Sequence, residues 1–158
     1  MTAEIAEGWL PLYYSPYRQE VYADQIKDAK DGFEISAGVI VNICDDVKKG
    51  LIPIKSNLAL YIGGMGAAKK NFHTDLMGRM GFEAEAKKIQ ELFLSGKRTE
   101  AILAVPDQFA DEISLVGPKD RIKERVEAWR DTPVTSLLIS THDKERLREV
   151  AELSLIHI

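Results

Sequence analysis

The chain has 158 residues, of which 45% are hydrophobic and 29% charged, and its 21 Lys and Arg against 25 Asp and Glu give a net charge of −4. This weakly acidic balance argues against a nucleic-acid partner, and no apolar run reaches the roughly 18 residues that a membrane span needs. The one cysteine, Cys44, excludes an internal disulfide. We therefore expect a cytoplasmic protein of a single domain.

The amino-terminal part of the chain alternates between strand and helix signals. An apolar and aromatic run at Trp9–Tyr14 predicts a strand, and the cap and proline at Ser15-Pro16 predict a helix that ends at Gly32. Phe33–Cys44 gives the clearest signal, because its odd positions are all apolar and its even positions are mostly smaller or polar. This alternation predicts a strand with one face on helices and the other facing a narrower, wetter space.

A long helix-rich insertion follows, over about residues 46–131. We expect a helix over Val47–Ile62 that Pro53 interrupts, and then helices at Asn71–Met80, Glu83–Ser95, Thr99–Val105, Pro106–Ile113 and from Gly117 onward. Val134–Ser140 predicts another strand, and Asp143–Glu152 a last helix. Strands that alternate with helices pair in parallel through right-handed crossovers. A closed eight-stranded α/β barrel needs about 200 residues or more, so this chain resembles the last part of one.

The last six residues, 153–158 (LSLIHI), depart from the charged helical pattern before them. They are also the translation of CTG TCT CTT ATA CAC ATC, the mosaic-end adaptor of transposase-based sequencing libraries. We interpret residues 153–158 as adaptor read-through and residues 1–152 as the native domain. The alternative is a natural apolar strand or helix end.

A glycine-rich stretch at Gly63–Lys69 invites comparison with a phosphate-binding loop. It lacks Gly-Lys-Ser/Thr at the required spacing, and it follows a helix instead of a strand. Two interpretations remain: a flexible connection between helices, or a close approach of the backbone to a ligand or a neighbour. In the same region His73 could carry a proton or contact a substrate, although a packing or surface role is the favoured interpretation. A metal site is not expected, since no second His or Cys stands at ligand spacing.

Polar and aromatic side chains stand near the carboxyl ends of the first two predicted strands. Asn42 and Cys44 lie on the even face of the second strand, where barrel enzymes place site residues and where a packed barrel interior is the alternative. Tyr13, Tyr14 and Ser15 end the first strand in the equivalent position. The tyrosines could stack on a planar ring, or they could pack against helices.

Several stretches together resemble the luciferase-like monooxygenase superfamily, over nearly the whole chain up to residue 152. Residues 3–11 (AEIAEGWLP) resemble its segment A-E-I-A-D-G-W-L-P, with Glu7 in place of the usual Asp. Further stretches resemble the deazaflavin-dependent (coenzyme F-420) class, namely 58–66 (LALYIGGMG), 71–73 (NFH), 79–82 (RMGF), 105–107 (VPD), and 115–118 (LVGP) with Arg121 and Ile122. Thr132-Pro133 departs from the usual Ala-Gly before the last strand.

This resemblance implies the carboxyl-terminal part of a TIM-like (β/α)8 barrel, with the last three βα units and the insertion between the final two strands. It also implies coenzyme F-420 at the carboxyl end of the barrel and hydride transfer to or from an unidentified organic substrate. Most phosphate contacts and acid–base residues of the family lie on earlier strands, so we expect the fragment alone to be inactive. The alternatives are an FMN-dependent monooxygenase that uses molecular oxygen and a non-catalytic α/β binding module.

The expected positions of the strand ends and of the glycine-rich turn assign one wall of the site. We expect Tyr13, Tyr14, Ser15 and Asn42 to lie toward the cofactor. The substrate side is assigned to Gly63, Gly64, Met65, Gly66, Phe72 and His73, and His73 is the candidate catalytic residue that this chain offers. The expected partner is a small organic molecule, and the sequence leaves open whether the full-length parent forms a homo-oligomer.

Overall fold

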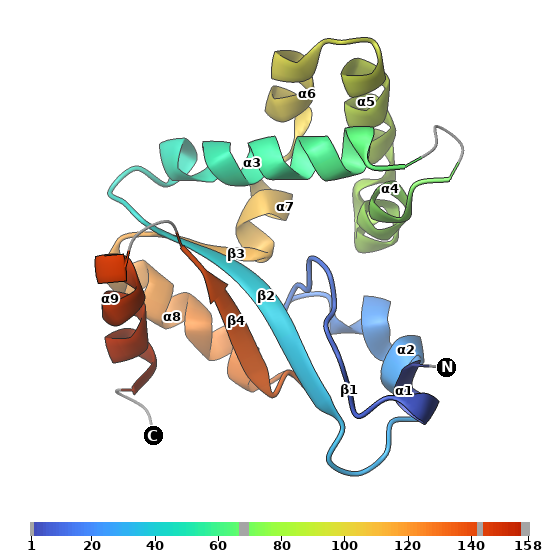
Figure 1. Ribbon diagram of the computed structural model, residues 1–158. Helices are drawn as coiled ribbons and strands as arrows, with labels where there is room; N and C mark the ends of the chain where they lie inside the picture. The colour runs from blue at the N-terminus through green and yellow to red at the C-terminus, as the bar shows by residue number, and fades with distance from the viewer. Residues whose placement is uncertain (1, 67–69, 142–143, 156–158) are drawn as a thin grey trace. The chain divides into compact units, whose positions relative to one another are not determined.

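The structure is a computed structural model that describes residues 2–66, 70–141 and 144–155, and it divides the chain into two compact units. The first unit comprises residues 1–47 and 112–158, and the second comprises residues 48–111. The first contains a parallel sheet with helices, and the second contains helices (Figure 1). In the described part of the chain, no helix is both long enough and apolar enough to cross a membrane.

The first unit alternates strands with helices along the chain. Its amino-terminal part contains α1 (Thr2–Ile5), β1 (Gly8–Trp9), the 3-10 helix η1 (Gln19–Tyr22), α2 (Ala23–Ile26) and β2 (Glu34–Ile43). Its carboxyl-terminal part contains β3 (Ser114–Gly117), α8 (Lys119–Arg130), β4 (Ser136–Ser140) and α9 (Lys144–Leu155).

Strand β2 is the centre of the sheet, and β1, β3 and β4 all pair with it in parallel. Ile40 of β2 pairs with Ser114 of β3 and also with Ser140 of β4, so β3 and β4 lie on opposite edges of β2. The predicted parallel pairing of the middle strand with both the first and the last strand is therefore confirmed, and the chain has an α/β fold.

Strand β1 lies on the same edge of β2 as β3. The backbone N–H of Glu34 donates to the carbonyl oxygen of Glu7 over 3.1 Å, while the carbonyl oxygen of the next residue, Ile35, accepts from Thr135 over 2.9 Å. Because the N–H and C=O of one residue point to the same edge of a strand, and those of the next residue to the other edge, β1 must lie opposite the segment that leads into β4. The two short strands β1 and β3 thus share one edge of β2, at its start and its end.

This arrangement explains why the prediction of a strand over Trp9–Tyr14 was wrong in extent, since β1 ends at Trp9. Pro11 has no backbone N–H to donate to a ladder. Continuing the β1 register would also place Tyr14 opposite Ile40, where Ser114 already pairs. The chain therefore leaves the sheet edge soon after Trp9.

The insertion that was predicted to be rich in helices also contains a strand, β3, which was not predicted. This strand has four residues, all of them buried. A short apolar run between two helices carries no periodic signal that separates a buried strand from a helix end.

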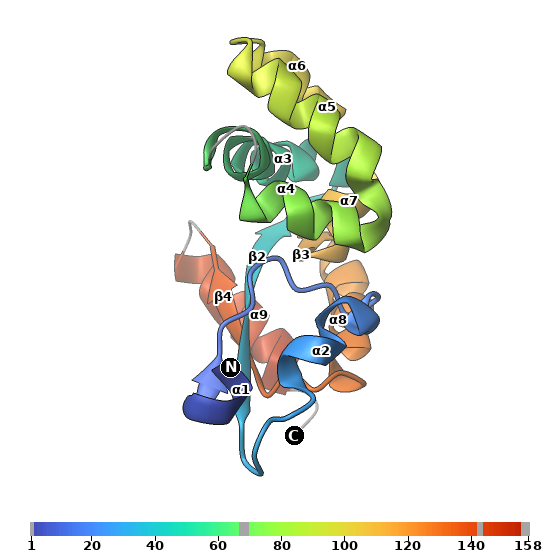
Figure 2. The same ribbon diagram turned by 90° about the vertical axis from the view of Figure 1, so that its right-hand side faces the viewer.

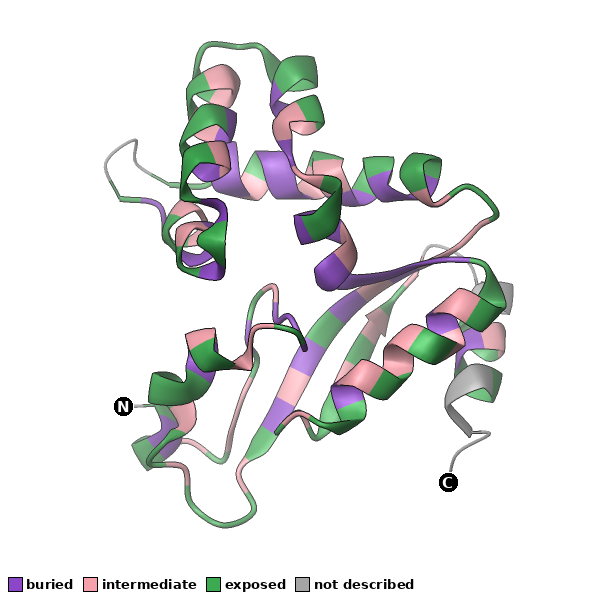
Figure 3. Ribbon diagram, turned by 180° about the vertical axis from the view of Figure 1, so that it is seen from behind, coloured by how far each residue is buried: buried purple, intermediate pink, exposed green. Residues whose placement is uncertain are grey.

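The two faces of β2 differ as the alternation predicted, and Figure 3 shows buried residues alternating with more exposed ones along the strand. Ala37, Val39 and Val41 are buried, and their register partners Leu137, Ile139 and Leu115 point to the same side. Helices α8 and α9 cover this odd face. On the even face Glu34 and Gly38 are exposed, whereas Ser36, Ile40 and Asn42 are half-buried.

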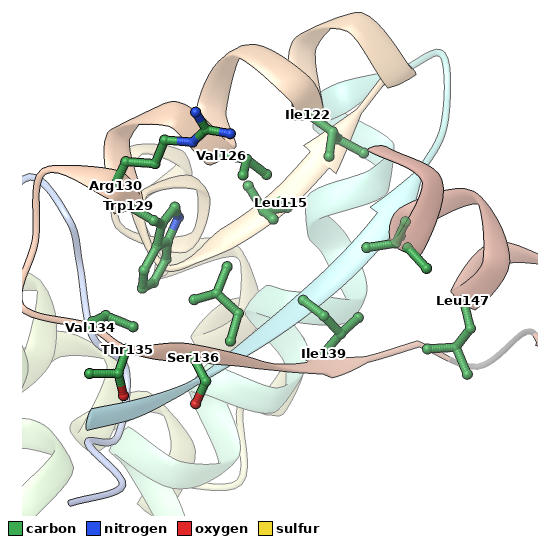
Figure 4. A pocket seen from close by; sticks show the side chains of 13 residues that line it. Leu115, Ile122, Val126, Trp129, Arg130, Val134, Thr135, Ser136, Ile139 and Leu147 are labelled. Atoms are coloured by element: carbon green, nitrogen blue, oxygen red, sulfur yellow. The ribbon is translucent and has the colours of Figure 1, made fainter. Parts of the chain in front are cut away.

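A largely apolar cavity of about 490 Å³ lies between the odd face of the sheet and helices α8 and α9 (Figure 4). Trp129 of α8 and Ile139 of β4 point into it, and Leu147 of α9 lies at its other end. None of the residues predicted to form the site lines this cavity. The remaining lining side chains are Leu115, Ile122, Val126, Arg130, Val134, Thr135, Ser136, Leu137, Val150 and Ala151.

The second unit is helical, and α5 and α6 lie side by side in it (Figure 2). Its elements are α3 (Val47–Gly64), α4 (Phe72–Met77), the π-helical turn η2 (Gly78–Phe82), α5 (Glu83–Leu94), α6 (Arg98–Ala104) and α7 (Asp107–Glu112). Phe82 and Phe109 meet edge to face in its core, with ring centroids 5.3 Å apart. Leu58, Ile62 and Ile89 are fully buried.

Three helix predictions need correction. Helix α3 continues through Pro53, since the buried face on both sides of the proline outweighs the cost of about 3 kcal/mol for the lost hydrogen bond and the ring clash. The helix predicted over Asn71–Met80 gives way at residue 78 to a turn with Gly81 at φ +91°. The helix predicted to end at Gly32 is reduced to η1 and α2.

Candidate functional site

The turn that follows β1 has an unusual backbone. Tyr13 has a φ of +51°, which is uncommon for a bulky residue because its Cβ crowds the backbone there. The hydroxyl of Tyr22 donates a hydrogen bond of 2.8 Å to the carbonyl oxygen of Tyr13. Strained residues of this kind persist only where their surroundings hold them, and they cluster at functional sites.

Tyr14, the next residue, belongs to an aromatic cluster in the core of the first unit. It is buried and stacks on Tyr22, with ring centroids 4.6 Å apart, and it also contacts Trp129 at 5.8 Å. Burial raises the pKa of the Tyr14 phenol, and the Thr132 side chain offsets part of that effect. The hydroxyl is thus protonated at neutral pH. A direct contact of Tyr14 with a cofactor stays a prediction, and in this structure its ring is used for packing.

Ser15 is also buried, and its hydroxyl joins distant parts of the chain. It accepts from the backbone N–H of Tyr17 over 3.2 Å and donates to a carboxylate oxygen of Glu112 over 3.3 Å. Arg18 donates to the two oxygens of Glu112 over 2.6 and 2.9 Å. This bidentate contact raises the pKa of Arg18. The turn after β1 is therefore linked by hydrogen bonds to Glu112, two positions before the start of β3.

Asn42 lies near the carboxyl end of β2 on the even face, as predicted, and is half-buried. Its register partner on β3 is Val116. Beyond it, the thiol of Cys44 donates to the carbonyl oxygen of Asp46 over 3.5 Å. An amide at this position can both donate and accept, which suits recognition of a polar heterocycle. Its contact with a cofactor stays a prediction.

In the second unit, two of the glycines serve helix packing. A Cβ atom at Gly63 would lie 2.4 Å from Cβ of Phe93, and one at Gly64 would lie 2.5 Å from its Cε1. The end of α3 therefore packs against α5 through backbone that no side chain covers. The glycine-rich stretch was interpreted either as a flexible connection or as a close approach of the backbone to a ligand or a neighbour. At Gly63 and Gly64 the structure shows a close approach to a neighbour, Phe93. Substrate contact by Gly63 and Gly64 stays a prediction, and Ala67–Lys69 lie outside the described residues.

Asn71 fixes the connection between α3 and α4. Its side-chain oxygen accepts from the backbone N–H groups of His73 and Thr74, over 2.9 and 3.3 Å, and so caps α4. Its side-chain nitrogen donates to the carbonyl oxygens of Ile62 and Tyr61, over 2.7 and 3.3 Å. These four bonds satisfy backbone groups at the end of one helix and at the start of the next. Gly66, at φ +151°, packs against Asn71.

His73 lies in a small aromatic group. Its ring meets Tyr61 at 5.1 Å and Phe72 at 5.7 Å, edge to face in both cases. Burial lowers the pKa of His73, so the imidazole is neutral at physiological pH. Phe72 and Met65 expose 60% and 51% of their surface. This part of the second unit therefore offers apolar surface and a neutral imidazole together.

The predicted residues form two sets, one in each unit. Tyr13, Tyr14, Ser15 and Asn42 belong to the first unit, and Gly63–Gly66, Phe72 and His73 to the second. Sequence reasoning missed Arg18 and Glu112. Glu112 forms an acidic pair with Asp111 at the end of a short helix, which is typical of a solvated surface. Nothing near Glu112 in the sequence indicates that its partner is Arg18, 94 positions earlier.

Comparison with known proteins decides the family. The model of the luciferase-like monooxygenase family (Bac_luciferase) matches residues 1–136. The chain belongs to this family. A relative in Mycobacterium tuberculosis (strain H37Rv), whose name assigns it to the coenzyme F-420-dependent oxidoreductases, is 35% identical over 162 aligned positions. The alignment covers 97% of this chain and 47% of that protein, so the chain spans about half the length of the curated relative.

A solved structure has the same fold as this luciferase-like chain. The coenzyme F-420-dependent tetrahydromethanopterin reductase of Methanopyrus kandleri matches with a TM-score of 0.66 at 23% identity. The match covers 95% of this chain and 44% of that one.

Proposed function

We propose that this chain is the carboxyl-terminal part of a (β/α)8-barrel oxidoreductase that transfers hydride between coenzyme F-420 and an organic substrate. The observation that carries the proposal is the 35% identity to an F-420-dependent relative over 97% of the chain. The parallel α/β sheet and the exposed or half-buried even face of β2 support it. We keep the cytoplasm as the expected compartment and a small organic molecule as the partner.

The residues of the first unit fit a flat heterocyclic cofactor. A Cβ atom built on Gly38, in the middle of the even face of β2, meets nothing within 4 Å. A planar ring can therefore approach the strand there, with Ser36 on one side and Ile40 and Asn42 on the other. The mix of one open glycine, one apolar side chain and polar groups is typical of small-molecule sites.

Deazaflavin, when bound, supplies a carbon at its central ring that carries hydride as a two-electron unit. The task of this chain is to hold and orient that ring. In our proposal the Asn42 amide would donate or accept a hydrogen bond to the cofactor, and Tyr13 would contact it from the turn after β1. Tyr14 and Ser15 are buried and hold that turn in place.

The second unit supplies the substrate side in this proposal. Phe72 and Met65 cover the apolar body of an organic substrate and exclude water, while Gly63, Gly64 and Gly66 keep the backbone of the α3–α4 connection compact. His73, neutral because of its burial, can donate or accept one hydrogen bond to a polar substrate group. It is the acid–base candidate of this chain.

Cofactor titration of the full-length protein, meaning the complete gene product that contains these residues, tests the proposal. We expect saturable quenching of deazaflavin fluorescence and weak or no binding of FMN. Tight FMN binding with no response to the deazaflavin would favour an FMN-dependent monooxygenase of the same family. Binding of neither, with a monomeric and stable chain, would favour a non-catalytic α/β module.

Sequencing the gene from source DNA past both ends of the chain tests its extent. We expect an upstream reading frame that supplies further βα units, and a native sequence after Glu152 that differs from residues 153–158. Residues 156–158 of that segment lie outside the described residues. A native frame that contains LSLIHI would overturn the adaptor interpretation.

A further inference from the structure

The Tyr13–Ser15 turn is held by side chains that come from later in the sequence. Tyr13 has its backbone in the left-handed region, and the Tyr22 hydroxyl holds its carbonyl oxygen. At the other end of the turn, the backbone N–H of Arg18 donates to the carbonyl oxygen of Ser15 over 3.2 Å. A strained turn that is fixed at both ends is preorganised, which reduces the entropy that a ligand must pay to order it.

Glu112 is the group on which these contacts converge. Its carboxylate accepts from the Ser15 hydroxyl and from two nitrogens of Arg18. The Glu112 side chain is 11% exposed and that of Arg18 is 23% exposed. Charge-assisted bidentate contacts of this kind are strong and directional, so they fix orientation as well as distance.

Stability alone gives a poor reason for this pair. Taking a carboxylate and a guanidinium out of water is costly, and apolar residues of similar size often stabilise a core as well or better. What the pair supplies is a fixed geometry between the turn after β1 and the start of β3. These two segments flank the same edge of β2, whose even face we propose as the cofactor wall.

We infer that Glu112 is a positioning residue for the cofactor, which it serves by holding Ser15 and Arg18 and, through them, the Tyr13 turn. This inference rests on the proposed function. Glu112 itself makes no contact with the cofactor in this account. Its loss should weaken cofactor binding more than it slows the reaction at saturating cofactor.

The test uses the full-length protein, meaning the complete gene product that contains these residues. Glu112→Gln keeps the size of the side chain and removes its charge, and Arg18→Lys keeps a charge and removes the guanidinium fork. We expect each variant to raise the Kd for F-420 about tenfold or more, with kcat at saturating cofactor within about twofold. Because both act through one set of bonds, the double variant should raise the Kd no further than the stronger single variant.

Lys30→Ala is the matched control, because Lys30 forms an exposed ion pair with Glu7 over 2.7 Å in the same unit. It should leave the Kd unchanged. A merely structural role would lower the Tm of Glu112→Gln and leave the Kd unchanged at temperatures where the variant is folded, and that result would overturn the inference. If Glu112→Gln does not fold, Arg18→Lys decides in the same way. Failure of the wild-type protein to bind F-420 would instead overturn the proposed function.

Discussion

A Cβ atom at Gly63 would lie 2.4 Å from Cβ of Phe93, closer than side-chain carbons approach in folded proteins. The end of α3 and the last turn of α5 are therefore in backbone-to-side-chain contact. Glycine inside a helix costs up to about 1 kcal/mol relative to alanine, and here it is the only residue that leaves space for the phenyl ring.

Gly63→Ala should therefore destabilise the full-length protein, by about 1–3 kcal/mol, although alanine is the better helix former. Urea unfolding followed by circular dichroism measures this loss. Gly38→Ala is the control, since a Cβ atom there meets nothing within 4 Å, and its stability should stay within about 0.5 kcal/mol of wild type. Equal stability of Gly63→Ala and wild type would show that α3 and α5 are not packed in this way.

The sequence was sufficient to predict those features that depend on local periodicity. The alternation in Phe33–Cys44 predicted a two-faced strand, and the structure shows β2 with odd residues buried and even residues more exposed. Parallel pairing followed from the order of strands and helices alone. The start of a helix near Asn71 and the end of α5 before Gly96 were also predicted, because the signals that start and end helices act on their immediate neighbours.

Features that depend on distant partners could not be predicted. The end of β1 depends on β3, which competes for the same edge of β2, and β3 itself is too short to show a period. The role of Glu112 depends on Arg18, 94 positions earlier. Likewise Phe93 explains the glycine pair at residues 63–64. The residues next to these glycines in the sequence do not indicate whether the backbone approaches a ligand or another helix.

Removal of the Asn71 side chain should loosen the connection between α3 and α4. Asn71→Ala removes the capping acceptor of the backbone N–H groups of His73 and Thr74. It also removes one of two side-chain donors to the carbonyl oxygen of Ile62, which keeps the Thr74 hydroxyl at 2.8 Å. We expect a loss of about 1–3 kcal/mol in unfolding free energy. Asn71→Asp keeps the capping oxygen and loses the donor, so it should fall between wild type and Asn71→Ala in a urea titration. A ranking with Asn71→Asp below Asn71→Ala would contradict this account.

Burial of His73 should make stability depend on pH in a defined direction. Its pKa is lowered in the folded chain, whereas the unfolded chain binds a proton near about pH 6.5. Between that value and the lower folded pKa, the unfolded state therefore binds more protons, and this contribution to stability is lost as the pH falls. Above about pH 6.5 the contribution is fully present.

His73→Gln removes this titrating group and provides the comparison. The difference in unfolding free energy between about pH 7.5 and about pH 5.5 should be smaller in His73→Gln than in wild type, because only wild type has a histidine at this position that titrates differently in the two states. Equal differences would show that the imidazole is solvated. A direct NMR titration of the His73 ring should give a midpoint below its ordinary value.

The last prediction concerns the 158-residue chain expressed alone. Leu138, at an even position of β4, is 47% exposed and pairs with Gly38. Ile40, the next even residue of β2, is only half-buried. Among the described residues, β4 has β2 as its strand partner and leaves its other edge unpaired. Open edges and exposed apolar side chains favour association with other copies. Each large apolar side chain left in water forgoes about 1.5–3 kcal/mol, against a total domain stability of about 5–15 kcal/mol.

We therefore expect the isolated chain to be oligomeric or poorly soluble and to bind F-420 weakly or not at all. Leu138→Lys should raise the monomer fraction in size-exclusion chromatography with light scattering, because it places a charge on the open face. Leu103→Lys is the control, since Leu103 is 71% exposed on α6 in the other unit, and it should change the monomer fraction little. A wild-type chain that is monomeric, unfolds cooperatively on heating and binds F-420 at micromolar concentration would refute this prediction and would support an autonomous module.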